Sequence, residues 1–331
     1  MKIIVIGLGS MGKRRIRLLS EHKDMTLFGI DNNQERCQEV KDKFGIKCYN
    51  SISEVIAVER PEAAVISTSP LSHAAIIKEC LLNNLHVFTE INLVPDGYEE
   101  NMKLAKEKGL ALFLSSTSLY QSDTLKIIER VKAANVGKLN YMYHVGQYLP
   151  DWHPWESYKN YFIRNPRTNG CREILTIDLP WIVTAFGDIK SVQVLKSKNT
   201  ELNIDYNDNY LIMMEHESGA KGVFAADVVA RKAIRHFEVY GEDLHMTWDG
   251  TPDTLLGYDI LKKKDIQLLG DMKTEHIEGY SNLIDENPYR DELQAFLDAV
   301  IDGKTPMWDF EKDYSLLKVI PPEAPPRKEG T

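Results

Sequence analysis

The chain has 331 residues, of which 43% are hydrophobic and 27% are charged, and its formal net charge is −9. This composition is typical of a globular protein, and the length favours two domains over one. The acidic excess gives no attraction toward nucleic acid or an anionic membrane surface, so we expect neither as a partner.

Targeting and metal-binding patterns are not found in the sequence. No apolar run approaches the roughly 20 residues of a membrane span, and the first residues lead directly into a glycine turn without a signal-peptide pattern. The four cysteines lie far apart and form no CxxC pair, so we expect no metal site and no disulfide framework. These features favour a cytoplasmic protein.

The first 120 residues alternate short apolar runs with longer amphipathic stretches. The runs predict strands at 2–6, 26–30, 63–67, 86–89 and 111–114, and the stretches predict helices at 13–20, 34–44, 71–82 and 98–108. Strands that are apolar throughout and are separated by helices are typical of a parallel sheet covered on both faces.

Beyond residue 120 the pattern changes. A predicted helix at 122–134 is followed by predicted strands at 138–149, 191–197, 209–217, 219–228, 235–240 and 244–248. Their partial alternation and intervening turns predict a large, mostly antiparallel sheet with one face that needs a cover. Apolar residues at helical spacing predict a last helix near 289–301, with Gly303 as its C-cap.

The predicted organisation is therefore an α/β domain over residues 1–120 followed by an α+β domain with an open sheet over residues 121–320. The tail, residues 321–331, contains four prolines and four charged residues, and we expect it to be disordered.

The segment Gly7-Leu8-Gly9-Ser10-Met11-Gly12 fits the pattern GxGxxG. It follows a predicted strand, opens a predicted helix, and is followed by Asp31 at the end of the next strand. In this context the pattern is the fingerprint of a doubly wound Rossmann fold that binds a dinucleotide. The alternative, a glycine turn in a domain that binds no dinucleotide, stays open.

Asp31 decides the expected cofactor. Its carboxylate is expected to accept hydrogen bonds from the ribose hydroxyls and to repel a 2′-phosphate, which favours NAD over NADP. Asn32 and Asn33 supply no compensating cation. The first set of expected NAD contacts is therefore Gly7, Gly9, Ser10, Met11, Gly12, Asp31 and Asn32.

Ligands of open α/β sheets bind beyond the carboxyl ends of the strands. We therefore expect further cofactor contacts from Thr68 and Ser69, which follow the strand at 63–67, and from Glu90 and Asn92, which follow the strand at 86–89. His73 lies on the first turn of the next helix, where it either contacts the cofactor or is a surface or capping residue.

Over about residues 1–320 the chain resembles the Gfo/Idh/MocA oxidoreductases. The resemblance implies NAD(P) in the first domain and a second domain whose open sheet carries substrate contacts and often the oligomer interface. Sugars, sugar nucleotides and cyclitols are the implied substrate classes, and a homodimer or homotetramer is the expected assembly. The matching elements are the glycine motif, Asp31, the segment Ser67-Thr68-Ser69-Pro70 with His73, the strand into Glu90, and the pattern Tyr289-x-x-Glu292-Leu293-x-x-Phe296.

Two departures from the family concern proton transfer. The family usually has Glu-Lys-Pro where this chain has Glu90-Ile91-Asn92, and isoleucine cannot move a proton. The family's helix with Asp and His matches residues 169–181, where Asp178 lies at or next to the histidine position and no histidine is present. Both usual proton handlers are absent, so proton transfer requires another residue, whereas NAD binding is unaffected.

A replacement is expected in the aromatic stretch 143–161, which resembles a segment of family members associated with bacterial surface-sugar pathways. His153 is the main candidate because the ordinary pKa of histidine is near 6.5; Asp178 and Tyr158 are alternatives. The alternative role of the aromatic residues is to cover the sheet or form a subunit interface. The expected substrate contacts are Trp152 and Trp155, by stacking, and Arg164 and Arg172, by binding an anionic group.

Three functions stay open. The first is an NAD-dependent oxidoreductase that transfers a hydride between nicotinamide and a carbinol carbon of a sugar or amino sugar, free or nucleotide-linked, in bacterial glycan biosynthesis. The second is an enzyme that uses bound NAD transiently for elimination or epimerisation of a sugar. The third is a redox-inactive NAD-binding sensor or partner subunit, which the loss of the lysine motivates.

Overall fold

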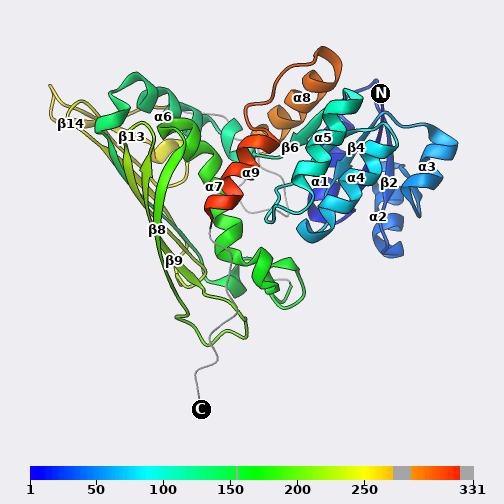
Figure 1. Cartoon of the computed structure of the whole chain (residues 1–331), viewed down its shortest axis with the longest axis horizontal. Coiled ribbons are helices and arrows are strands. Elements are labelled where there is room, and N and C mark those ends of the chain that lie inside the picture. Colours follow the sequence, from blue (N-terminus) through cyan, green and yellow to red (C-terminus); the bar gives the residue numbers. More distant parts are fainter. Residues whose placement is uncertain (154–155, 271–284, 321–331) are drawn as a thin grey trace. The chain divides into compact units, whose positions relative to one another are not determined.

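The computed structural model describes residues 1–153, 156–270 and 285–320 (Figure 1). The chain divides into two compact units, each of which contains two separate stretches of sequence: unit 1 comprises Met1–Thr117 and Tyr289–Ser315, and unit 2 comprises Ser118–Pro288 and Leu316–Thr331. The sequence division into residues 1–120 and 121–320 had placed 289–315 with the second domain, whereas the structure places this stretch in unit 1. The tail predicted to be disordered lies outside the described residues.

Unit 1 is built on a parallel sheet of six strands. They are β1 (Lys2–Ile6), β2 (Thr26–Ile30), β3 (Lys47–Tyr49), β4 (Ala63–Ile66), β5 (His86–Thr89) and β6 (Leu112–Leu114). Their order, β3-β2-β1-β4-β5-β6, changes direction between β1 and β4, as in a doubly wound Rossmann sheet. The predicted fold class is confirmed, and the carboxyl ends of these parallel strands share one edge.

Helices connect these strands, and two more follow near the end of the chain. They are α1 (Ser10–Leu19), α2 (Gln34–Phe44), α3 (Ile52–Glu59), α4 (His73–Leu82), α5 (Tyr98–Lys108), α8 (Asn287–Asp302) and α9 (Phe310–Val319). Local capping fixes α2, because the Asn33 side chain accepts hydrogen bonds from two backbone N–H groups of its first turn and Gly45 ends it in the left-handed conformation. No helix among the described residues has the length and apolarity to cross a membrane.

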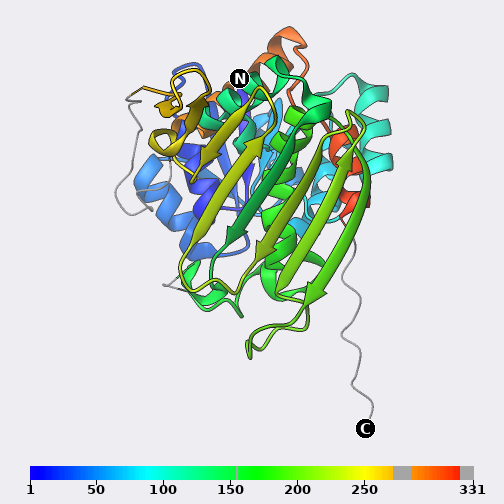
Figure 2. The same ribbon diagram turned by 90° about the vertical axis from the view of Figure 1, so that its left-hand side faces the viewer.

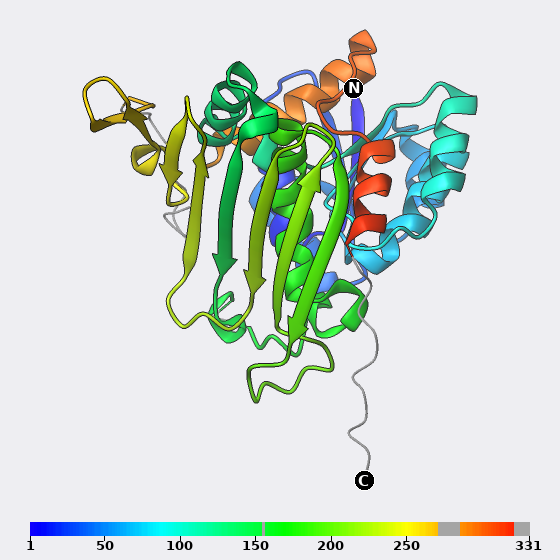
Figure 3. The ribbon, with the colours of Figure 1, turned by 60° about the vertical axis from the view of Figure 1, so that its left-hand side comes forward.

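Unit 2 contains a sheet of eight strands, and the predicted strands are present within a few residues. They are β7 (Asn140–Gly146), β8 (Ile189–Ser197), β9 (Asn209–His216), β10 (Lys221–Asp227), β11 (Ile234–Tyr240), β12 (His245–Trp248), β13 (Leu256–Asp259) and β14 (Lys264–Gln267). The order across the sheet is β14-β13-β12-β11-β7-β10-β9-β8 (Figure 3). Among the described strands of this sheet only β7 and β10 pair in parallel, so the predicted, mostly antiparallel sheet is confirmed.

One face of this sheet is covered by helices, and the other face is open (Figure 2). The helix α7 (Gly170–Phe186) packs on β9 and β10, and α6 (Ser122–Ala133) packs on α7. Side chains of β9 alternate between the two faces, so Tyr210 and Ile212 are buried whereas Leu211 and Met213 are exposed.

Candidate functional site

The glycine turn after β1 has the geometry that dinucleotide binding requires. Gly7 has φ +89°, and a Cβ on it would lie 2.6 Å from the Ser67 carbonyl oxygen. A Cβ on Gly12 would lie 1.9 Å from the carbonyl oxygen of Gly7, so only glycine lets α1 start this close to the strand. At Gly9 nothing lies within 4 Å of an added Cβ, which leaves room for a pyrophosphate against the backbone.

The start of α1 adds a favourable field for an anion. Gly9 is the N-cap of this helix, and within the described residues no side chain caps it and no acidic residue occupies its first turn. The first backbone N–H groups, which belong to residues such as Ser10 and Met11, are therefore available to a phosphate at the positive end of the helix dipole. The residues present fit the pyrophosphate of a dinucleotide.

Asp31 follows β2 and is fixed by the backbone. Its Oδ2 accepts a hydrogen bond from the Leu8 N–H (2.7 Å) and its Oδ1 accepts one from the Asn33 N–H (2.7 Å). The sequence analysis overlooked Arg36, whose guanidinium lies 3.6 Å from Oδ2 and whose side chain is 51% exposed. An arginine here can neutralise Asp31 in part and can bind a 2′-phosphate, so the NAD preference depends on both residues. Asn32 is exposed beside them.

His73 is an interior residue, because only 1% of it is exposed. Its Nε2 lies 3.0 Å from the Thr68 carbonyl oxygen, and its Nδ1 lies 2.7 Å from the side-chain oxygen of Asn92. Burial lowers the pKa of His73 and favours the neutral ring. Through these contacts His73 connects the turn after β4 to the turn after β5. In the turn after β4, the Ser69 side chain is exposed. Of the alternatives for His73, a surface position is excluded, whereas its contact with the cofactor stays a prediction.

Glu90, the last expected cofactor contact in unit 1, belongs to a buried ion-pair network. Arg15 donates from Nε (2.7 Å) and from one terminal nitrogen (3.0 Å) to its two carboxylate oxygens, and also donates to Glu292 (2.7 Å). Burial alone would lower the pKa of Arg15, but the charges of Glu90 and Glu292 raise it above its ordinary value. The side chain of Glu90 is still 12% exposed, which leaves it an edge for a ligand. Arg15 was not predicted from the sequence.

Asp178 in unit 2 is not arranged for proton transfer. It is completely buried, and its Oδ1 accepts hydrogen bonds from Tyr143 (2.8 Å), Trp181 (3.1 Å) and Arg235 (2.7 Å). These partners hold the carboxylate in the interior of unit 2. We therefore withdraw Asp178 as a proton handler, because its acceptor capacity is used by the fold.

Arg172 also has a structural role instead of the expected substrate contact. It is 6% exposed and donates to the carbonyl oxygens of Leu317 (3.5 Å) and Ile320 (3.4 Å), where α9 ends. A cation at this position satisfies helix carbonyls and complements the helix dipole. Arg164, in contrast, is exposed at the end of a short 3-10 helix and stays a predicted substrate contact. Trp155 lies outside the described residues.

His153 and Trp152 lie in one loop of unit 2. The His153 ring packs edge-on against Tyr161, with 5.0 Å between ring centroids, and burial lowers the pKa of His153. Trp152 donates from its indole to the Gln147 carbonyl (2.9 Å), which fixes the plane of its ring. Tyr158 is half-buried in the same loop. The roles of these three residues toward a substrate stay predictions.

Sequence analysis missed Glu173. This residue lies in the first turn of α7, where acidic residues are common as helix-terminal charges, so its spacing carried no functional signal. Its Oε2 is buried and has no hydrogen-bond partner within the described part of the chain, as is also true of the Tyr161 hydroxyl. Burial raises the pKa of Glu173 to about 7.

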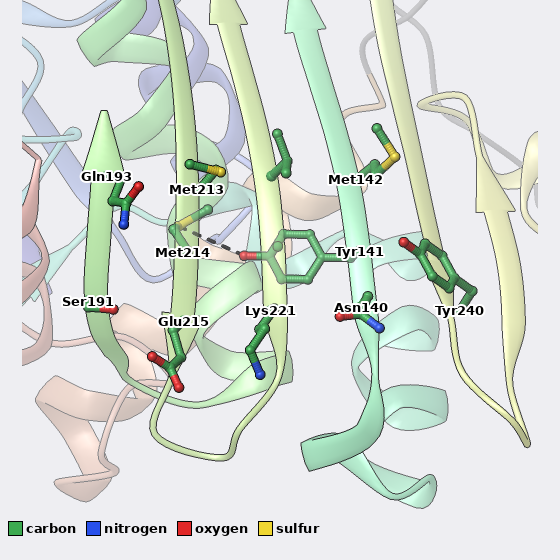
Figure 4. A pocket seen from close by; sticks show the side chains of 12 residues that line it. Asn140, Tyr141, Met142, Ser191, Gln193, Met213, Met214, Glu215, Lys221 and Tyr240 are labelled. Atoms are coloured by element: carbon green, nitrogen blue, oxygen red, sulfur yellow. Dashed lines mark hydrogen bonds between the residues drawn. The ribbon is translucent and has the colours of Figure 1, made fainter. Parts of the chain in front are cut away.

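A depression of about 360 Å³ lies on the open face of the eight-stranded sheet (Figure 4). Its lining is largely apolar and includes Met142, Met213 and Val223, which neighbour one another across β7, β10 and β9. None of the predicted cofactor or substrate residues lines it. The depression is therefore separate from the predicted cofactor and substrate residues.

Comparison with known proteins gives a family match for most of the first stretch of unit 1. Residues 1–116 match the model of the Gfo/Idh/MocA oxidoreductase family, NAD-binding Rossmann fold. Residues 1–116 are therefore similar to the NAD-binding domain of this family. The resemblance and the NAD cofactor predicted from the sequence are thereby confirmed.

Individual relatives extend the comparison. The myo-inositol 2-dehydrogenase of Thermotoga maritima is 28% identical over 142 residues, which cover 42% of this chain and 42% of that protein. The UDP-N-acetylglucosamine 3-dehydrogenase GnnA of Acidithiobacillus ferrooxidans has a similar structure, with a TM-score of 0.75, 18% identity, and coverage of 96% of this chain and 94% of the other. An oxidoreductase of Agrobacterium radiobacter in complex with NAD⁺, L-tartaric acid and magnesium gives a TM-score of 0.78 at 12% identity, with coverage of 96% and 94%. At these identities the two structures show that the fold extends over both units.

Proposed function

We propose that this protein is an NAD-dependent oxidoreductase that transfers a hydride between nicotinamide and a carbinol carbon of a sugar or amino sugar, free or nucleotide-linked, in the bacterial cytoplasm. The observation that carries the proposal is the open backbone at Gly9 between the two sterically required glycines, together with Asp31 at the end of β2. When bound, NAD supplies a hydride acceptor or donor at nicotinamide C4.

In this proposal different residues of unit 1 bind different parts of the cofactor. The turn from Gly7 to Gly12 and the start of α1 hold the pyrophosphate, and Asp31 accepts from the adenosine ribose. Thr68 and Asn92, which His73 keeps in place, and the exposed edge of Glu90 serve the nicotinamide end. Proton transfer has to come from another residue, because Ile91 replaces the family lysine.

The proposed substrate class rests on two kinds of support. The relatives named above include a dehydrogenase of myo-inositol and one of UDP-N-acetylglucosamine, both of which act on polyhydroxylated rings. In unit 2 the fixed indole of Trp152 offers a stacking surface, and the exposed Arg164 offers a bidentate contact for an anionic group of a nucleotide-linked or acidic sugar. A place in glycan biosynthesis is part of this proposal.

The experiment is a substrate screen that follows nicotinamide absorbance with the purified full-length chain and NAD⁺. Cyclitols, pyranoses, amino sugars and UDP-sugars are each added, and products are analysed by mass spectrometry. Accumulation of NADH equal to the ketone formed supports the proposal. Sugar conversion without accumulation of NADH would instead identify transient use of NAD. Binding of NAD without conversion of any compound would identify a redox-inactive sensor, the alternative suggested by Ile91 in place of the family lysine.

A further inference from the structure

The loops that follow β7 and β10 are joined through their backbones. These two strands pair in parallel, so both loops begin at the same edge of the eight-stranded sheet. The Tyr148 N–H donates to the Ala230 carbonyl oxygen (2.7 Å). One residue further on, the Leu149 N–H donates to the Val228 carbonyl oxygen (3.1 Å). The turn after β10 is therefore held in place against the loop after β7.

The guanidinium group of Arg231 is oriented at this junction. It stacks over the ring of Tyr148, 4.0 Å from the ring centroid. Arg231 is exposed, and within the described part of the chain it forms no hydrogen bond and no ion pair. A stacked guanidinium keeps its N–H donors directed outward in one plane. Because stacking already restricts the side chain, a ligand that binds it loses less conformational entropy.

The nearest carboxylate in the sequence does not neutralise Arg231. Asp227, at the end of β10, accepts hydrogen bonds with Oδ1 from the Val229 N–H (2.8 Å) and the Ala230 N–H (2.7 Å). Its Oδ2 lies 2.7 Å from Nε2 of His144. This carboxylate therefore shapes the turn that presents Arg231, and the charge of the guanidinium is available to a ligand.

The two loops are basic, although the chain as a whole is acidic. Residues 147–168 and 228–233 contain five basic residues and two acidic ones, whereas the whole chain has a net charge of −9. The basic residues are Lys159, Arg164, Arg167, Arg231 and Lys232. Like charges in one surface region add to a local positive potential. This edge of unit 2 should therefore attract an anion.

The indole of Trp152 lies against the same junction. Its N–H donates to the Gln147 carbonyl oxygen (2.9 Å), the residue before Tyr148. A Cβ on Gly170 would lie 3.3 Å from the Trp152 ring and 2.8 Å from Val228, so the indole packs close to the start of the turn after β10. Since Trp152 is only half-buried, a flat apolar surface and an oriented cation occur in adjoining loops.

We propose that Arg231 binds an oxyanion of the substrate, either a carboxylate or a phosphate group, so that the protein prefers an acidic substrate to its neutral parent compound. This inference rests on the proposed function. Arg231 is a binding and specificity residue in it, and takes no part in hydride or proton transfer. Carboxylate and phosphate share the chemistry that a guanidinium recognises, namely two oxygens that accept two parallel N–H bonds.

The test compares neutral compounds with their acidic derivatives. Glucose, glucuronate, glucose 1-phosphate and UDP-glucose are each titrated into the NADH-loaded full-length protein by calorimetry, and N-acetylglucosamine is compared with its 1-phosphate and its UDP ester. We expect at least one acidic compound to bind about tenfold or more tightly than its neutral parent. Its binding should weaken as the salt concentration rises. The derivative that binds most tightly distinguishes a carboxylate from a phosphate.

Substitutions then assign this preference to a residue. Arg231→Gln should remove the preference for the acid, and Arg231→Lys should restore only part of it, because an ammonium group cannot form the planar paired contact. Tyr148→Leu should weaken acid binding by about threefold by releasing the stacked side chain. Lys232→Gln is the matched control, since it removes the neighbouring exposed cation and should change binding by less than about twofold.

Thermal unfolding separates binding from folding. We expect Arg231→Gln to unfold at the wild-type temperature and to bind neutral compounds like the wild type, because Arg231 holds no hydrogen-bond partner in the described fold. The proposed site is overturned if no acidic compound binds more tightly than its neutral parent. It is also overturned if Arg231→Gln and Lys232→Gln weaken acid binding equally.

Failure of this inference differs from failure of the proposed function. NADH formation from a neutral sugar, with no preference for its acidic derivatives, would overturn the anion site and leave the oxidoreductase function standing. Binding of an acidic compound that depends on Arg231, with no NADH formed from any compound, would overturn the oxidoreductase function and leave the anion site.

Discussion

Arg15 on α1 and Glu292 on α8 are 277 residues apart in the sequence, yet their side chains pair at 2.7 Å and both are completely buried. Glu292 also accepts hydrogen bonds from the Ser115 hydroxyl and the Ser116 N–H, just after β6. Through these contacts α8 closes the nucleotide-binding unit, which explains why unit 1 contains two distant stretches of the chain.

Removal of the cation from this network should strongly destabilise unit 1. Arg15→Gln leaves the completely buried carboxylate of Glu292 without its cation, so we expect a loss of about 3–5 kcal/mol in the free energy of unfolding. Urea unfolding of the full-length chain measures it. The matched control is Arg290→Gln, at the start of α8, which breaks the surface pair with Glu21 and should cost less than about 1 kcal/mol. Similar losses in both variants would contradict a special role for the buried pair.

Cofactor preference should depend on Asp31 and Arg36 in opposite ways. We expect the wild-type chain to bind NAD(H) more tightly than NADP(H), because the carboxylate repels a 2′-phosphate. Asp31→Ala should weaken NAD binding and narrow the preference, whereas Arg36→Gln should weaken NADP binding more than NAD binding. Calorimetric titrations with both cofactors give the comparison, and equal affinities in the wild type would defeat this prediction.

Glu173 should make the stability of the protein depend on pH. Its pKa rises from 4.5 in an unfolded chain to about 7 in the fold, so the folded state holds the proton more tightly. The resulting stabilisation is present below pH 4.5 and is lost as the pH rises through 7, by about 3 kcal/mol in total. Between pH 5 and pH 8, urea unfolding should show this loss in the wild type and in Glu217→Gln, but not in Glu173→Gln. The same dependence of the free energy of unfolding on pH in all three proteins would rule out this contribution of Glu173.

His153→Ala should lower kcat only modestly. Burial lowers the pKa of His153, so its ring is neutral and contacts Tyr161 by its edge. We expect a loss of about tenfold or less for His153→Ala, without the loss of 10²–10⁴ that removal of a general acid–base residue causes. Steady-state rates at several pH values measure the size of this loss. A larger loss of kcat for His153→Ala would support His153 as the acid–base residue, as predicted from the sequence.

The open sheet face should mediate self-association. Met142, Met213 and Leu195 are 51%, 51% and 70% exposed on this face, and soluble monomers rarely expose so much continuous apolar surface. Sedimentation of the wild type at micromolar concentration should give a dimer or tetramer, and Met213→Glu should shift it toward monomer. Leu261→Glu is the control, because Leu261 is 94% exposed in the turn between β13 and β14. A monomeric wild type would contradict this assembly.

Most helices and strands could be predicted from the sequence because the spacing of apolar residues reflects which side chains are buried. The continuous apolar strands β1 and β4 and the alternating strand β9 each carried the pattern of their environment. The strands β3, β13 and β14 were missed because they contain polar residues or glycine in place of a continuous apolar run, whereas the equally short β4 and β5 are largely apolar.

The site was predicted less evenly than the fold. Glycine spacing identified the cofactor turn because steric demands there are local. Asp178 and Arg172 looked functional only because their partners, Arg235 and the carbonyls at the end of α9, come much later in the chain. Glu173 was overlooked for the opposite reason, since only tertiary structure reveals that an ordinary helix-terminal glutamate lacks a partner.

The late position of α8 has a consequence for synthesis on the ribosome. All six strands of the nucleotide-binding sheet have emerged long before Phe296, which packs at 5.6 Å and 5.8 Å from the rings of Phe88 and Phe113. Until then the nascent sheet has an uncovered aromatic surface beside an arginine with only one of its two carboxylates. Completion of the first unit therefore waits for nearly the whole of the second to be translated, and the nascent N-terminal segment is the part of this protein most in need of a chaperone.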